Sequence, residues 1–268
     1  MDPTTILSAA RLALEETAGR VAAMVRALPD LETPLSNSSD WTVREAAVHL
    51  VNYAGIYADI AQGMNSPVRA LNREHLAVEN DMRIADIPET DPAQVADLLL
   101  EAVDVLLDGT ASLPGEQPVV FHGGTPLDVA GLVAISLGEH LLHGYDIAEA
   151  VGVPWPVDPN HAQLVLYGYA PCYGKLINPK TAQGLNAGFG VEIRGGAAFT
   201  VRFTDGVYGV EPPGALPIDA TISTDPAAFL LVGSGRLSPW SAMALDLFTP
   251  GGPDTGLALR FLDLFVYP

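Results

Sequence analysis

The hydrophobic pattern of the chain changes once, and this change constrains the fold more than any other feature. Over the first ~150 of the 268 residues, apolar side chains recur at helical spacing. After about residue 185, short runs of β-forming residues alternate with glycine turns. Residues 153–159 lie between the two patterns and contain three prolines, which is typical of a linker. We therefore expect an α+β protein with two domains, residues 1–155 and 156–268.

Four helices are expected in the first domain, at residues 5–28, 42–63, 91–108 and 125–150. The second opens with a capping box formed by Thr42 and Glu45. The fourth is expected to begin at Thr125, with Pro126 at its first helical position. Four helices of these lengths favour an antiparallel four-helix bundle, which can bind metals between facing helices. A further helix is expected to follow Asp158 and to reach about residue 169.

The second domain is predicted to be small and of the α+β class. Strands are expected at residues 191–194, 199–203 and 218–223, with hairpin turns at 195–196 and 205–206. A helix is expected to open at Asp225–Pro226 and a last one to cover residues 254–265.

Composition excludes several classes of partner. The net charge is −19, so the chain repels phosphate backbones and anionic lipid heads, and we expect neither nucleic acid nor membrane as a partner. The single cysteine, Cys172, precludes an intramolecular disulfide. The N-terminus lacks the pattern of a signal peptide, and we expect a cytoplasmic protein. Monomer and homodimer both remain open.

The strongest chemical signal is a pair of metal-ligand side chains in the fourth expected helix. Glu139 and His143 are four residues apart, about 40° from each other around an ideal helix, whereas His140 lies about 100° away from Glu139. His49, in the apolar second helix, could supply a third donor. Three protein ligands with one open position are typical of catalytic zinc sites. On spacing alone, a hydrogen-bonded surface pair and a buried core histidine are equally compatible with the pattern.

Asp146 lies about 20° from Glu139 on the same helical face. Histidines that bind metals commonly donate their second N–H to a carboxylate. Asp146 is therefore a candidate orienting partner of a ligand histidine, the alternative being an acid on the helix surface.

Two segments carry a family resemblance. Residues 41–50, WTVREAAVHL, resemble the W-T-V-R-D-x-x-x-H-L signature of the DinB-like, mycothiol-dependent maleylpyruvate isomerase family. Residues 138–148, GEHLLHGYDIA, resemble its x-E-x-x-x-H-G-x-D-L-A segment. Residues 225–236, DPAAFLLVGSGR, resemble the sterol-carrier-protein-2-like domain that often follows. The resemblance implies a DinB-like bundle that binds a divalent metal, usually zinc, through His49, Glu139 and His143.

The resemblance also implies a low-molecular-weight thiol, mycothiol in characterised members, as cosubstrate beside a small-molecule substrate. A metal-bound thiol is more readily deprotonated, and the thiolate is the nucleophile for S-transfer or for cis–trans isomerisation. Two other functions remain open: a hydrolase or lyase that uses metal-bound hydroxide, and a non-catalytic binding protein with a structural metal.

An anionic substrate needs a cationic anchor, and the chain has only 13 lysines and arginines. The resemblance implies an arginine from the second domain, for which Arg236 is the first candidate and Arg260 the second. Arg83 is a further candidate in the first domain.

Overall fold

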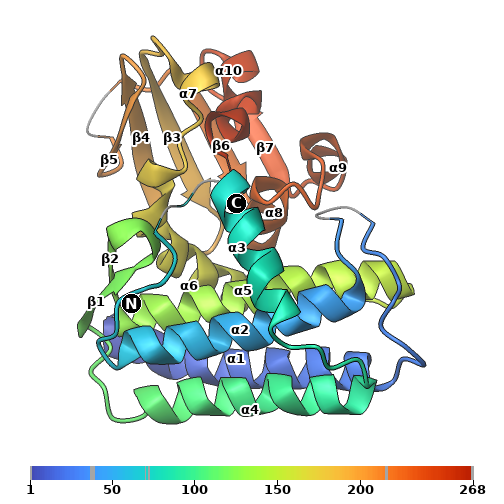
Figure 1. Ribbon diagram of the computed structural model, residues 1–268. Coiled ribbons are helices and arrows are strands. Elements are labelled where there is room, and N and C mark those ends of the chain that lie inside the picture. Colours follow the sequence, from blue (N-terminus) through green and yellow to red (C-terminus); the bar gives the residue numbers. More distant parts are fainter. Residues whose placement is uncertain (1, 37–39, 70, 72, 215–216, 267–268) are drawn as a thin grey trace. The chain divides into compact units, whose positions relative to one another are not determined.

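The computed structural model describes residues 2–36, 40–69, 71, 73–214 and 217–266 (Figure 1). The chain divides into two compact units, Met1–Pro171 and Cys172–Pro268, which are described separately below. The first unit is mainly helical and the second combines short helices with a five-stranded sheet. The predicted α+β class is therefore confirmed. Within the described residues, no helix combines the length and the apolar character that a bilayer crossing requires.

A four-helix bundle forms the body of the first unit, as predicted. Its helices are α1 (Pro3–Arg26), α2 (Val43–Ala61), α4 (Pro92–Thr110) and α5 (Val129–Val151). Helices α1 and α2 each pack against both α4 and α5, so the four enclose one core. The capping box predicted at the start of α2 is present, with Thr42 and Glu45 bonding each other's backbone N–H groups.

The bundle helices run two in each direction (Figure 1). Arg11, near the start of α1, donates to the Leu107 carbonyl near the end of α4, so these two helices are antiparallel. Gln62, after the end of α2, donates to the Gly109 carbonyl at the end of α4, so those two are parallel. The chain can run this way because an extra helix, α3 (Arg73–Ala85), connects α2 to α4. The sequence analysis missed α3, whose residues are mostly polar or exposed.

The predicted start of the fourth bundle helix at Thr125 is wrong. Residues Thr125–Asp128 form strand β2, which pairs with β1 (Pro118–Phe121) in an antiparallel hairpin. Helix α5 begins at Val129, where the Asp128 carboxylate accepts the Gly131 N–H at 2.7 Å. The hairpin forms because pairing buries Val119 opposite Leu127, and the turn uses glycines with positive φ.

Helix α6 (Pro159–Tyr169) belongs to the first unit, although the expected boundary at residue 155 precedes it. It packs against α5 at very close range. A Cβ on Gly168 would lie 2.7 Å from the Gly131 carbonyl oxygen, so only glycine allows this approach. Because α6 packs on the bundle, the boundary between the two compact units falls after this helix, near residue 171.

The second unit is built on a mixed sheet with the strand order β5-β4-β3-β6-β7. Its strands are β3 (Ala187–Ile193), β4 (Ala198–Thr204), β5 (Val207–Glu211), β6 (Ala220–Thr224) and β7 (Phe248–Gly251). Strands β3 and β6 are parallel and the other neighbours antiparallel. The hairpin turn predicted at Asp205–Gly206 joins β4 to β5, with φ of 51° and 80°.

Four short helices accompany the sheet: α7 (Pro179–Ala182), α8 (Pro226–Gly233), α9 (Pro239–Ala244) and α10 (Thr255–Leu259). Helix α8 begins at the predicted position. The expected helix over 254–265 is wrong in length, because α10 ends at Leu259 and a 3₁₀ segment, Phe261–Leu264, follows after the cap residue Arg260. The sequence analysis missed β5, β7 and α9. The sterol-carrier-protein-2-like character of this unit stays a prediction.

Candidate metal centre

His49, Glu139 and His143 lie together between α2 and α5. His49 is in the second turn of α2, and the other two are in the second half of α5. Because α2 and α5 are antiparallel, the start of one helix lies beside the end of the other. Each of the three residues offers one ligand atom, and these atoms lie within 4.8 Å of one another. The structure thus brings together the three residues that the sequence analysis had selected as a group.

The separations between donor atoms suit a metal better than direct hydrogen bonds. His49 Nε2 lies 3.5 Å and His143 Nε2 3.6 Å from the same oxygen of Glu139, Oε2. Charge-assisted hydrogen bonds are shorter, about 2.7–2.9 Å. Zinc–ligand bonds of about 2.0–2.1 Å at tetrahedral angles place neighbouring donors roughly 3.4 Å apart. Two imidazole nitrogens and one carboxylate oxygen are also a donor set typical of zinc.

Aromatic rings surround the histidines. The ring centroid of Trp41 lies 5.0 Å from that of His49 and 5.8 Å from that of His143. Tyr53, one helical turn after His49, lies 4.3 Å from it by the same measure. The capping box at Thr42 sets the position of Trp41, the preceding residue. These rings cover part of the two imidazoles.

The protonation states favour cation binding. Burial lowers the pKa of His49, which is 5% exposed, so its imidazole is neutral at neutral pH. Burial alone would raise the pKa of Glu139, but its interactions with His49, His143 and Tyr169 outweigh burial and lower that pKa to about 2. Neutral histidine and ionised glutamate are the forms that bind metals.

Two further side chains contact the three candidate ligands. Asp146, which is buried, places Oδ2 3.3 Å from His143 Nδ1, on the side of the ring opposite the ligand nitrogen. Tyr169, at the end of α6, donates its hydroxyl to Glu139 Oε1 at 3.2 Å. The sequence analysis missed the contact of Tyr169, because no local spacing relates α6 to α5. His140, which the sequence analysis set aside because of its helical angle, is outside this group, and its Nδ1 bonds the Ser136 carbonyl at 2.8 Å.

The candidate anchoring arginines fall in different units. Arg83 is on α3 in the first unit, with the three candidate ligands. Arg236 and Arg260 are in the second unit, where Arg236 bonds the Ser234 carbonyl at 3.3 Å.

The fold and the site define a class of protein, a helical bundle with a two-histidine, one-glutamate candidate metal centre and an α+β unit after it. Residues 11–148 match the family model described as the mycothiol maleylpyruvate isomerase N-terminal domain, and the chain belongs to this family.

The solved structures of a mycothiol-dependent maleylpyruvate isomerase and of a variant of it are similar in fold. The TM-scores are 0.53 and 0.54 at 15% and 14% identity, over 94% of this chain and 93% of each other chain. No curated protein matches the chain.

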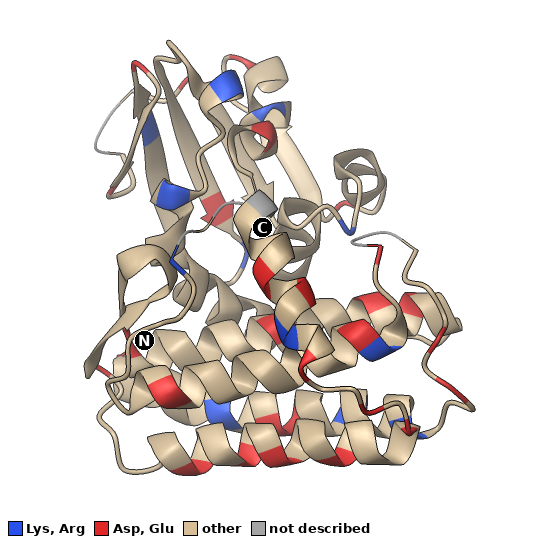
Figure 2. Ribbon diagram, in the orientation of Figure 1, with Lys and Arg blue, Asp and Glu red and all other residues tan. Residues whose placement is uncertain are grey.

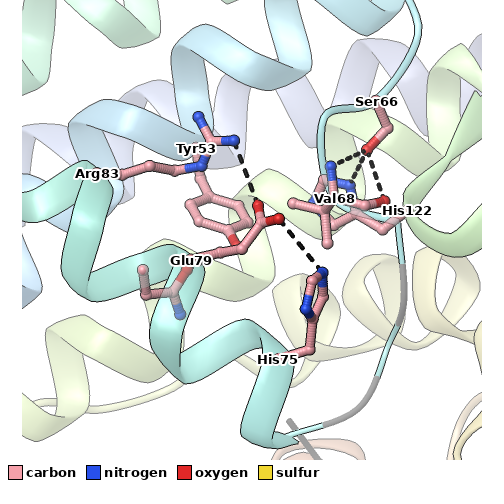
Figure 3. A network of polar contacts seen from close by, with 8 residues as sticks. Tyr53, Ser66, Val68, His75, Glu79, Arg83 and His122 are labelled. Atoms are coloured by element: carbon pink, nitrogen blue, oxygen red, sulfur yellow. Dashed lines mark hydrogen bonds and ion pairs between the residues drawn. The ribbon is translucent and has the colours of Figure 1, made fainter.

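Another buried histidine, His122, lies in the turn between β1 and β2. Its Nδ1 is 2.6 Å from the Ser66 hydroxyl oxygen, and Phe121 stacks on its ring (Figure 3). Burial lowers the pKa of His122 to about 4. Since an unfolded histidine titrates near 6.5, the folded state binds this proton less readily than the unfolded state.

Acid is therefore expected to destabilise the first unit through His122. The contribution of neutral His122 to the free energy of unfolding is complete above pH 6.5. It declines by about 1.4 kcal/mol per pH unit as pH falls towards 4, so that about 2 kcal/mol is lost by pH 5. Urea unfolding of metal-free protein, followed by helical circular dichroism at pH 7 and pH 5, measures the decline. His122→Gln should lose about 2 kcal/mol less than the wild type between these pH values. Equal losses would contradict the assignment.

Proposed function

We propose that this chain is a divalent-metal-dependent, isomerase-like enzyme that uses a low-molecular-weight thiol, similar to mycothiol, as cosubstrate. The observation that carries the proposal is the group of His49, Glu139 and His143, whose donor atoms lie within 4.8 Å of one another. Both histidine nitrogens are 3.5–3.6 Å from Glu139 Oε2, close to the donor separation of a tetrahedral zinc site. Membership of the mycothiol maleylpyruvate isomerase N-terminal domain family supports the thiol. Zinc is the proposed metal, because the donor set matches its preferences.

The protein's own side chains would prepare the site. His49, neutral, and Glu139, ionised, need no proton release before they bind a cation. Tyr169 would hold the second oxygen of Glu139, and Asp146 would orient His143 through Nδ1. Trp41 would limit the access of water. The bound metal would lower the pKa of a coordinated thiol.

The proposed chemistry is a reversible addition to an activated cis double bond. The sulfur forms a bond to one alkene carbon, and the π electrons move to the carbon next to the activating carbonyl group. Rotation about the resulting single bond and elimination of the same thiolate give the trans product. Atoms and electrons balance without an oxidant or reductant. Transfer of the sulfur to another electrophilic carbon would use the same site and is the alternative outcome.

Binding of a thiol tests this proposal directly. Zinc-loaded and metal-free protein would be titrated with N-acetylcysteine and with its S-methyl derivative, which cannot form a thiolate, and the melting temperature recorded. We expect N-acetylcysteine alone to raise it, and only in zinc-loaded protein. Zinc content measured after each titration controls for extraction of the metal by the thiol. Equal responses to both compounds, or with and without zinc, would contradict the proposal.

Asp146→Asn is expected to weaken zinc binding by about 10- to 100-fold. The change keeps the size of the side chain but removes the carboxylate that faces His143 Nδ1, and loss of such an outer partner typically has an effect of this size. Competition with a chromogenic chelator measures the affinity. Asp97→Asn, which removes an exposed acid paired with Arg26, is the matched control and should bind zinc like the wild type. Equal affinities for both variants would exclude the proposed role of Asp146.

A further inference from the structure

Strand β5 forms one edge of the sheet in the second unit, and no described strand pairs with its outer side (Figure 1). The hydrogen bonds of the sheet show which of its residues face outward. Between β3 and β4, the Ile193 N–H donates to the Ala197 carbonyl at 2.8 Å. In an antiparallel pair, residues that exchange hydrogen bonds alternate with residues that do not. The registers of β3 with β4 and of β4 with β5 therefore direct the backbone groups of Val207, Gly209 and Glu211 towards β4.

Tyr208 and Val210 are left with N–H and C=O groups that point away from the sheet. No backbone hydrogen bond joins these groups to a described residue elsewhere in the chain. Val210 is also 54% exposed, and Val207 is 70% exposed. An exposed, apolar edge strand with unpaired backbone groups is a template for another strand. The outer side of β5 therefore has both the backbone groups and the apolar surface that strand pairing uses.

The opposite edge of the same sheet, β7, is blocked. The Asp225 N–H donates to the Leu247 carbonyl at 2.8 Å, so the same alternation directs the backbone groups of Phe248 and Pro250 outward. Proline has no N–H to donate, and a proline on an edge strand is a common protection against unwanted pairing. The outward positions of β5 hold neither proline nor a charged residue. Only β5 of these two edges is open to a further strand.

The charge distribution favours a near-neutral strand as the partner of β5. Residues 1–171 contain 24 acidic and seven basic side chains, whereas residues 172–268 contain eight and six (Figure 2). The first unit thus carries −17 of the net charge of −19. Glu211 is the one charged residue of β5, so a basic strand from another protein would find little to attract it there. An apolar strand with few charges fits better, and β5 of a second copy is such a strand.

We propose that β5 pairs in antiparallel orientation with β5 of a second copy of this chain, with Gly209 at the two-fold axis. In this register, Tyr208 and Val210 of the partner subunit exchange both backbone hydrogen bonds, and the reciprocal pair does the same. The side chain of Val210 then lies beside that of the partner's Tyr208. Gly209 faces Gly209 of the partner subunit in a pair without hydrogen bonds, where the Cα atoms approach to about 4.5 Å.

The length of the strand limits the strength of this dimer. Strand β5 has five residues, and Pro212 and Pro213 follow it directly, so pairing cannot extend further along the chain. One such strand pair buries less than the about 1,200 Å² at the lower end of standard interfaces. We therefore expect a weak, concentration-dependent dimer. Salt should strengthen it, because ions screen the repulsion between the two acidic first units.

Light scattering on full-length protein tests the inference. We expect the molar mass to rise from 28.2 kDa towards twice that value as the concentration increases from about 1 µM to about 1 mM. The rise should begin at lower protein concentration in about 0.5 M than in about 0.05 M sodium chloride. Wild-type protein that stays monomeric at about 1 mM in both salts would overturn the inference, whatever other strand can bind β5.

A charge swap at residue 209 tests the register. A Cβ at Gly209 would have the Arg202 carbonyl oxygen, at 4.0 Å, as its nearest neighbour among the described residues, so larger side chains fit the folded monomer. Gly209→Glu and Gly209→Lys each place like charges opposite one another across the axis, and each should weaken dimerisation at least about 10-fold. An equimolar mixture of the two variants should regain dimers, because opposite charges then face each other. A structural defect in either variant would not be repaired by mixing.

Val210→Lys should also weaken the dimer, because it places a charge beside the partner's Tyr208. Val105→Lys is the matched control, since Val105 is a similarly exposed valine on α4 in the first unit, and it should dimerise like the wild type. Circular dichroism of each variant verifies that it is folded. Dimers of Gly209→Glu and Gly209→Lys as stable as those of the wild type would exclude β5 as the interface. A mixture of the two that associates no better than either variant alone would contradict the proposed register.

Discussion

His49→Ala and His143→Ala are each expected to reduce zinc affinity by more than about 100-fold and to bring thiol-dependent activity to background. Each substitution removes one of only three protein ligands, whereas loss of an outer partner alone costs about 10- to 100-fold. Two remaining donors hold zinc weakly, and Glu139 also loses one of the two histidines that keep its carboxylate ionised.

Elemental analysis of the purified proteins, followed by competition with a chelator, measures the loss. His161→Ala is the matched control, because His161 lies on α6 in the same unit and outside the three-residue group. We expect this control to retain the wild-type metal content. If His49→Ala and His143→Ala also retain it, the three residues are not the metal site.

Gly144→Ala is expected to destabilise the first unit by about 3 kcal/mol. A Cβ at residue 144 would overlap Trp155 Cζ2 and lie 2.8 Å from its Cε2. The ring cannot easily withdraw, because Trp155 Nε1 donates to the Leu141 carbonyl and Arg20 lies over the ring at 4.0 Å. Relief of the overlap therefore has to displace α5 next to His143 or break these contacts.

Thermal unfolding of metal-free protein tests the effect of Gly144→Ala. A loss of this size lowers the melting temperature by roughly 6–12 °C for a unit of this length. Gly19→Ala provides the matched control, because a Cβ there meets no atom within 4 Å and alanine favours the interior of α1 by about 0.5–1 kcal/mol. A Gly144→Ala variant as stable as Gly19→Ala would show that Trp155 does not require the glycine.

The spacing of Glu139 and His143 illustrates what could be predicted from the sequence. Their shared helical face, and the exclusion of His140, follow from the angle between successive residues. The capping box that begins α2 could also be predicted, because it joins Thr42 and Glu45 within one helical turn. The partnership with His49 was a hypothesis until the antiparallel packing of α2 and α5 placed the three residues together.

Features that depend on distant partners could not be predicted in this way. Residues 125–128 have the composition of a helix start, yet they pair with β1 because the hairpin buries apolar side chains on both strands. Helix α3 has a weak hydrophobic pattern of its own, and hydrogen bonds to α2 help to hold it in place. Its attachment places Asn80 in a hydrogen bond with Tyr53, whose ring contacts His49.

The sequence by itself therefore determined the two-part α+β organisation, the bundle helices and the donor pair Glu139 and His143. These features depend on hydrogen bonds, helical angles and hydrophobic periods within short segments. Only the tertiary structure decided that α6 packs on the bundle, that Tyr169 bonds Glu139, and that Arg83 lies on a helix attached beside His49. Those contacts join residues far apart in the chain, and their formation depends on how whole helices pack against one another.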